Sequence, residues 1–323
     1  MTSVRPGLAA AAATALLWLA GPGRCLAQEP AQTNTDVPWR TSYFPYLSGL
    51  SNDGPLISGR IRYSQAAPYE ERVTSRAYVQ LDAGVGFRGT RFAAAQFGAP
   101  LWLKDWRFTA LTIASREARY GFFGLGNGTT YDKANVTDAD PFFYRVQRTN
   151  YFGSVEVTRR IVGQLQVALQ ASAQSTKFVA HDEGTSVFLQ QFGPSMKQGD
   201  AGVRAALVFD SRDTEYDPHR GLLLESGYQV ATGGGNYERL YGVFRGWVQL
   251  REGTIFAARL AGSQLYGEPT LDARFVIPAW ERPIPVLGGS FSFRALQTGR
   301  LAGKGVLLGN FEVRQHLKTF GGV

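Results

Sequence analysis

The sequence predicts an all-β protein, a transmembrane antiparallel β-barrel of which about twelve strands are present. Aromatic residues make up 13% of the 323 residues and 38 residues are glycine, a composition that suits strands and turns. Apolar and polar residues alternate in segments of about 10–14 residues, longer than the usual strands of soluble sheets. After the N-terminal segment, no apolar stretch approaches the length of a membrane-spanning helix. Strands are therefore the elements expected to cross a membrane.

The N-terminal residues carry the pattern of a secretory signal peptide. Arg5 supplies a positive charge, residues 8–20 form a short apolar run, and Cys25 and Ala27 place small residues before the cleavage site. The run is too short to span a membrane, and Arg24 fits poorly with lipid attachment at Cys25, so export is the favoured interpretation. The expected division of the chain is a signal peptide (1–27), a polar spacer (28–38) and the barrel domain (39–323).

Two segments illustrate the alternation on which the strand prediction depends. In the first, Val79, Leu81 and Val85 share one face, while Gln80 and Asp82 share the other. In the second, Val203, Ala205, Leu207 and Phe209 stand opposite Arg204, Asp210 and Arg212. Successive side chains of a strand point to opposite faces, so each segment has one apolar and one polar face. The strands are predicted, with ends good to roughly ±2–4 residues, at 42–50, 55–65, 74–87, 90–101, 105–119, 142–159, 163–177, 199–212, 221–232, 238–251, 254–266 and 303–315.

A soluble β-sandwich with one solvent-exposed face on each sheet would also show this alternation. Segment length and the Arg, Asp, Glu and Gln residues of the polar face favour a barrel with a hydrated interior. Aromatic residues near the segment ends suit a membrane–water boundary, although a soluble core would use them too. Long connections are predicted at 121–141, 178–199 and 267–302, with short turns between some of the other strands. Such unequal connections are typical of outer-membrane barrels.

Two sequence motifs are not explained by the alternation of apolar and polar residues. The first runs Asp210-Ser211-Arg212-Asp213 and continues through Pro218 to Gly221. Taken alone, it indicates a charged strand end followed by a turn. The second is the Gly-rich stretch Leu287–Arg294, followed by the strand Val306–Arg314. Taken alone, it indicates a surface loop with a solvated arginine.

These segments, in this order, resemble the BamA/TamA-type outer-membrane assembly barrels, the bacterial surface antigen family. The matching residues are Asp210, Arg212, Asp213, Pro218 and Gly221 in the first segment, Gly288, Gly289 and Arg294 in the loop, and Asn310, Glu312 and Arg314 in the strand. The stretch Tyr120–Asn127 is similar to a Gly-Asn segment of the same superfamily, and the resemblance covers most of the chain after residue 27.

The resemblance implies a protein of the bacterial outer membrane that assists the insertion or translocation of other proteins. The implied partners are outer-membrane lipid, client outer-membrane proteins and periplasmic assembly factors. The rival interpretation is a passive pore or a surface-exposed binding barrel.

The resemblance also implies that the loop folds back into the barrel, where its arginine meets acids on the inner wall. We hypothesise that Arg294 and Glu312 form this latch, because guanidinium–carboxylate pairing can be bidentate. The chain departs from the family pattern at Ala295 and Leu296, where the family has Gly and an aromatic residue. Only 28–38 precedes the first strand where the family has periplasmic repeat domains. The family barrel has about sixteen strands, so the chain is expected to be a fragment or to close through a partner.

No enzyme chemistry is predicted. The three histidines, His181, His219 and His316, are scattered along the sequence and leave little material for a metal site or a catalytic triad. There is no Gly-x-Ser-x-Gly turn, no phosphate-binding loop and no nucleic-acid-binding module. We therefore expect no catalytic residue, metal, cofactor or nucleic-acid partner.

Overall fold

The computed structural model of the chain describes residues 37–50, 53–69, 71–285, 287–289, 292–293 and 295–316. The chain divides into two units, Met1–Pro38 and Trp39–Val323. The predicted signal peptide and residues 28–36 of the spacer lie outside the described residues. Every strand described below belongs to the second unit.

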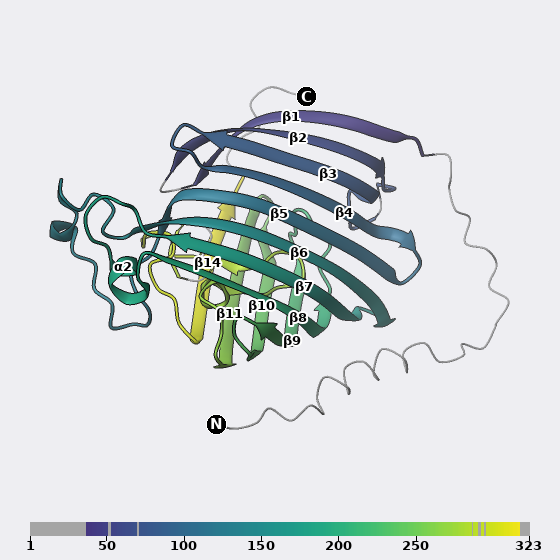
Figure 1. Cartoon of the computed structure of the whole chain (residues 1–323). Coiled ribbons are helices and arrows are strands. Elements are labelled where there is room, and N and C mark those ends of the chain that lie inside the picture. Colours follow the sequence, from purple (N-terminus) through teal and green to yellow (C-terminus); the bar gives the residue numbers. More distant parts are fainter. Residues whose placement is uncertain are drawn as a thin grey trace. The chain divides into compact units, whose positions relative to one another are not determined.

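Within the described residues, twelve strands form one antiparallel sheet in which each strand pairs with the next along the chain (Figure 1). This arrangement confirms the all-β fold class and the predicted strands. The strands are β1 (Trp39–Leu50), β2 (Gly54–Ala66), β3 (Ser75–Gly86), β4 (Arg91–Leu103), β5 (Trp106–Gly121), β6 (Arg145–Val162), β7 (Leu165–Val179), β8 (Ser195–Asp210), β9 (Gly221–Gly233), β10 (Tyr237–Arg251), β11 (Thr254–Gly267) and β14 (Gly305–Gln315).

The small elements lie in the connections. The short helix α2 (Val187–Phe192) follows β7, and the two-residue strands β12 (Val276–Ile277) and β13 (Ile284–Pro285) pair with each other between β11 and β14. Two 3-10 turns, η1 (Lys133–Asn135) and η2 (Asp272–Phe275), complete the described elements. The β12–β13 pair was not predicted, because two-residue strands have no measurable alternation.

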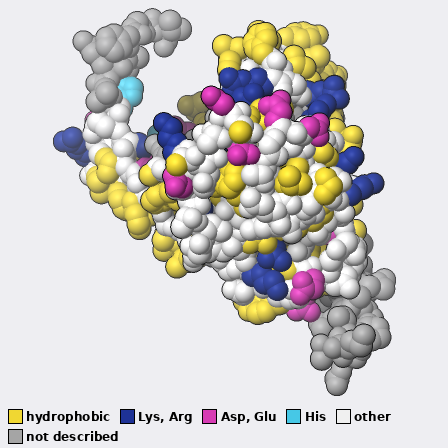
Figure 2. Space-filling model, turned by 60° about the vertical axis from the view of Figure 1, so that its left-hand side comes forward, with side chains coloured by type: hydrophobic (Ala, Val, Ile, Leu, Met, Phe, Trp, Pro, Cys, Tyr) yellow, Lys and Arg dark blue, Asp and Glu magenta, His cyan; other side chains and the backbone are white. Residues whose placement is uncertain are grey.

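The two faces of the sheet have opposite chemistry. On β8, Val203 and Leu207 expose 51% and 56% of their surface, whereas Arg204 exposes 5% and Asp210 none. Hydrophobic side chains are accordingly exposed on the surface of the molecule (Figure 2). A water-soluble sheet would bury the aliphatic side chains and expose the charged ones. The reversed pattern is the one expected of a wall with lipid outside and polar groups inside.

Antiparallel pairing sends successive connections to alternate ends of the strands. One end, called here the short-turn rim, carries 67–74, 104–105, 163–164, 211–220 and 252–253. The other end, the long-loop rim, carries 122–144, 180–194 and 268–304. The turns at Gly163 (φ 54°) and Gly253 (φ 71°) use left-handed backbone, as two-residue hairpins require. The three long connections match the predicted ones to within a few residues.

The apolar core lies between the inner face of the later strands and the connection 268–304, called here the inner loop. Buried loop residues, including Phe275, Ile277 and Trp280, belong to one cluster with buried wall residues such as Val208 and Leu223. The inner loop therefore packs as an integral layer of the fold.

Candidate functional site: the anchored inner loop

The inner loop begins with contacts near the long-loop rim. The Thr270 hydroxyl donates to Asp200 Oδ2 on β8 at 2.7 Å, and Asp272 forms an ion pair with Arg148 on β6 at 2.7 Å. Arg239 on β10 donates to the carbonyl oxygen of Val276 at 3.0 Å and also to that of Ala273. Three separate strands thus hold the first turn of the loop.

Trp280 anchors the loop deeper in the interior. Its backbone N–H donates to Glu225 Oε2 at 2.7 Å, and its indole Nε1 donates to Thr158 Oγ1 at 3.0 Å. Glu225 also accepts a 2.6 Å hydrogen bond from the Tyr241 hydroxyl, while Arg204 binds Glu156 at 2.5 Å beside it. A buried indole needs a partner for its N–H, and the wall supplies one.

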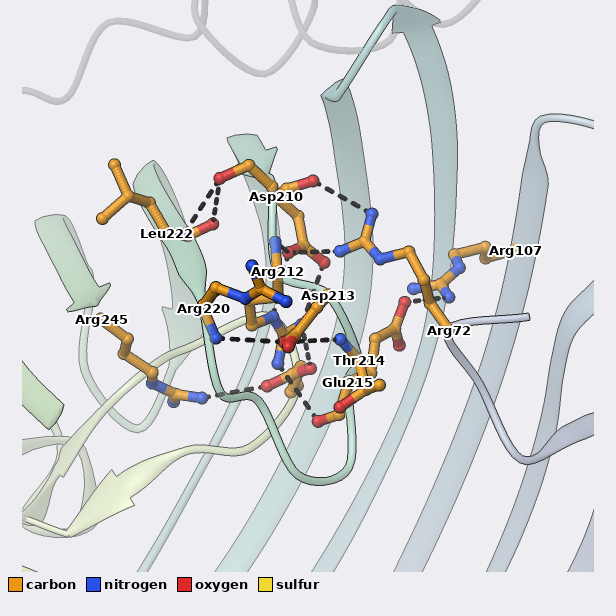
Figure 3. A network of polar contacts seen from close by, with 12 residues as sticks. Arg72, Arg107, Asp210, Arg212, Asp213, Thr214, Glu215, Arg220, Leu222 and Arg245 are labelled. Carbon is orange, nitrogen blue, oxygen red and sulfur yellow. Dashed lines mark hydrogen bonds and ion pairs between the residues drawn. The ribbon is translucent and has the colours of Figure 1, made fainter. Parts of the chain in front are cut away.

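A third set of contacts lies where β8 meets the short-turn rim. Glu281 of the inner loop bridges Arg212 at 2.6 Å and Arg245 on β10 at 3.0 Å. Figure 3 shows Arg72, Asp210, Arg212 and Arg245 in this network of polar contacts. The side chain of Arg212 is almost fully buried and also pairs through two nitrogens with Asp210. Arg72, from the 67–74 connection, reaches Asp210 at 2.6 Å. We call Arg72, Asp210, Arg212, Arg245 and Glu281 the rim cluster.

Electrostatics favour the charged form of Arg212. Burial opposes ionisation, but hydrogen bonds to Asp210 and the charge of Glu281 outweigh it and raise the pKa of Arg212. Removing one partner from such a buried network leaves the other charged group without compensation. The rim cluster can therefore hold the inner loop as long as all its members are present.

The turn 211–220 sets the position of Arg212. The Asp213 carboxylate accepts hydrogen bonds from the backbone N–H groups of Thr214, His219 and Arg220. Slight burial disfavours the charged form of the carboxylate and would raise its pKa. The three hydrogen bonds outweigh this effect and lower the pKa of Asp213.

Gly221 closes the same turn with φ +108°, and a Cβ there would lie 2.4 Å from the Ser211 carbonyl oxygen. Pro218, in the same turn, is buried. These contacts give a structural reason for the first motif, although β8 ends at Asp210, so Arg212 belongs to the turn and not to the predicted strand 199–212.

In the second motif, Asn310 of β14 connects the inner loop to the wall. Its side-chain Nδ2 donates to the Ser292 carbonyl oxygen at 2.7 Å, while its Oδ1 accepts from Arg259 on β11 at 2.6 Å. Gly288 and Gly289, with φ of 129° and 90°, form the bend that brings Ser292 there. A Cβ at Gly288 would lie 2.0 Å from a neighbouring backbone oxygen, so only glycine fits.

The hypothesised latch has one member outside the described residues, Arg294. Glu312 is exposed on β14 and lies 3.4 Å from Arg314. The Arg294–Glu312 pair therefore stays a prediction.

Several loop anchors were not singled out from the sequence, among them Arg148, Glu225, Asp272, Trp280 and Glu281. Arg148 and Glu225 are charged residues at inward positions of predicted strands, and this pattern could have identified them as candidates. No local pattern distinguishes Asp272, Trp280 and Glu281 from other loop residues.

The described residues contain no group of His, Cys, Asp and Glu side chains that could hold a metal ion. They also include no helix long and apolar enough to cross a membrane. A cavity of about 310 Å³ remains between Trp280 and the inner face of β2–β6 near the short-turn rim. Tyr78, Arg107 and Glu156 form part of its lining.

Comparisons with known proteins agree with the architecture. A family model described as the Omp85 superfamily domain matches residues 77–313. The fold is similar to a crystal structure of BamA from Haemophilus ducreyi lacking POTRA domains 1–3, with a TM-score of 0.52 and 12% sequence identity. That match covers 84% of this chain and 52% of the other, so the chain spans about half the length of that structure. The search of curated proteins returned no match.

Proposed function

Because the chain belongs to the Omp85 superfamily, we propose that it works in the bacterial outer membrane, where it assists the insertion or translocation of other proteins. Outer-membrane lipid, client outer-membrane proteins and periplasmic assembly factors are the partners that this proposal implies. Catalysis by residues of the chain plays no part in it.

The anchored inner loop is the observation that carries this proposal. A passive pore needs an open interior, whereas Phe275, Ile277 and Trp280 pack against the wall of β6–β11. Anchors at three depths hold the loop there: Arg148 on β6, Glu225 on β9, and finally Arg212 and Arg245, which both bind Glu281. A loop with so many wall contacts can fix the shape of the barrel while strands elsewhere rearrange.

The sheet edges give a physical route for the activity. Among the described residues, β1 and β14 stand at the two ends of the strand order and each pairs with one neighbour. Unpaired N–H and C=O groups on such an edge can accept a further strand by β-augmentation.

The experiment uses the purified full chain in phospholipid vesicles and a small outer-membrane barrel, unfolded in urea, as client. Folding of the client is followed by its heat-modifiable gel mobility. Vesicles containing an equal mass of an unrelated folded outer-membrane barrel control for packing defects that any inserted protein creates. The proposal expects faster client folding with this chain than with the control barrel.

Equal client folding in the two sets of vesicles would overturn the proposal. Release of a small trapped solute is measured in parallel. Rapid release without accelerated folding would support the passive pore instead.

A further inference from the structure

A row of basic side chains crosses the outer face of five neighbouring strands. Arg91 on β4 lies directly opposite Arg116 on β5, and Lys177 on β7 lies directly opposite Lys197 on β8. Thr149 on β6 joins the two pairs, because it is the register partner of both Arg116 and Lys177. All four basic residues are exposed. We call Arg91, Arg116, Lys177 and Lys197 the cation row.

The row faces away from the inner loop. It shares the face of Tyr151, Val203 and Leu207, which are exposed apolar residues of the same strands. Counting every second position from the row, β4–β8 carry no acidic residue on this face over 91–97, 108–116, 149–157, 167–177 and 197–209. Within the described part of the chain, none of the four belongs to an ion pair, and Arg116 donates a 3.0 Å hydrogen bond to Gln147.

This arrangement is unfavourable for the protein alone. Like charges directly opposite each other on an antiparallel pair have Cβ atoms about 5 Å apart and repel. Two such pairs occur side by side in one row. Neighbouring strands are about 4.8 Å apart, so the row extends over roughly 19 Å. An anionic partner that contacts several strands at once would relieve the repulsion.

The depth of Lys197 places the β8 end of the row at a membrane surface. Register partners lie perpendicular to the strands, so the rest of the row is inclined to that surface by the strand tilt. Lys197 and Leu207 are ten positions apart on β8, which at about 3.3 Å per residue and a 35–45° tilt gives roughly 25 Å along the membrane normal. That is the height of the apolar band of an outer-membrane barrel. Lys197 therefore lies at the headgroup level on the side of the long-loop rim.

Small side chains leave two shallow apolar hollows in the band. One lies beneath the row, and the other extends from the β4–β5 end of the row across β3 and β2 to β1. One, of about 680 Å³, is lined in part by Ala95, Gly153 and Ala171. The other, of about 710 Å³, is lined in part by Ala93 and Ala114. Both open on the same outer face, and their lining is mostly apolar. Exposed apolar surfaces of this kind mark interaction sites, and acyl chains fit them.

We propose that this outer face binds phosphate-bearing lipid of the leaflet at the long-loop rim. The cation row contacts the headgroup phosphates, and acyl chains lie in the two hollows. A headgroup with two phosphates suits the row better than one with a single phosphate, because cations on β4–β5 and β7–β8 can be neutralised together. The inference rests on the outer-membrane location in the proposed function and names the class of lipid that the chain binds, but it requires no client protein.

Binding is measured with the full chain in zwitterionic micelles, by displacement of a fluorescent bis-phosphorylated glucosamine-disaccharide lipid. Lys177→Gln/Lys197→Gln should weaken binding about 25-fold, since each basic residue near a lipid surface contributes about 5-fold in affinity. The matched control is Lys104→Gln/Arg220→Gln, which removes two exposed charges at the short-turn rim. Its affinity should stay within about 2-fold of the unmodified chain.

Lys197→Glu separates lipid binding from folding. It puts opposite charges across the β7–β8 pair, so the lipid-free barrel should unfold at a higher temperature while its lipid affinity falls. Equal binding of the dephosphorylated glycolipid, or unchanged affinity in the double variant, would overturn the proposal. Full displacement of the lipid by millimolar inorganic phosphate would do the same, because the site would then recognise the free ion. Client folding in purely zwitterionic vesicles tests the proposed function separately.

Discussion

Glu281 offers the sharpest test of how the inner loop is held, because it is the residue of the loop that enters the rim cluster. Glu281→Gln keeps the size of the side chain and one acceptor oxygen but removes the charge that Arg212 and Arg245 share. Hydrogen bonds to charged groups contribute about 1.5–3 kcal/mol each. Arg212 keeps Asp210, and the Glu281 side chain is 27% exposed, so the two losses do not add in full. We expect the closed loop to lose about 2 kcal/mol.

Limited proteolysis measures this loss directly. Chymotrypsin cleaves after Phe275 and Trp280, which are buried and become accessible only when the loop opens. When opening is fast relative to cleavage, the rate follows the open population, so 2 kcal/mol corresponds to about 30-fold faster cleavage. Glu252→Gln, an equal charge change in an exposed short turn, is the control and should cleave at the unmodified rate. If the Glu281 and Glu252 variants are cleaved equally fast, the rim cluster does not hold the loop.

Four further outcomes are expected. Gly221→Ala should destabilise the barrel by about 2 kcal/mol or more in a denaturant titration, since its φ of +108° and its close backbone contact exclude a Cβ; Gly128→Ala, with open space around it, should have little effect. Trp280→Phe should cost about 1 kcal/mol in the same titration by removing the indole hydrogen bond, and an unchanged midpoint would contradict its role as an anchor. The lowered pKa of Asp213 means that its contribution is complete above the unfolded pKa of about 3.9 and is lost as pH falls through the folded pKa, so Asp213→Asn should flatten the acid limb of the stability curve. Arg294→Ala should lower barrel yield or heat resistance on gels, and unchanged folding and activity would refute the latch.

Part of the site could be predicted from the sequence because its signals are local. Arg212 and Gly221 stand in a motif whose spacing fits a strand end and a turn, and the structure gives each a definite contact. The partner of Arg212 in the inner loop, Glu281, is 69 positions away, and no spacing rule connects them. The same holds for Trp280 and Thr158, which are 122 positions apart.

The sequence by itself determined the period of two, the twelve strands of the described sheet and the faces on which charge and apolar side chains lie. It could do so because alternation in a strand depends only on neighbouring residues. Register between strands and the path of the inner loop depend on packing between distant segments, which the tertiary structure alone decided. Pairing brought Lys177 opposite Lys197, and packing against β6–β11 brought the inner loop to Arg212, although neither contact leaves a trace in the local pattern.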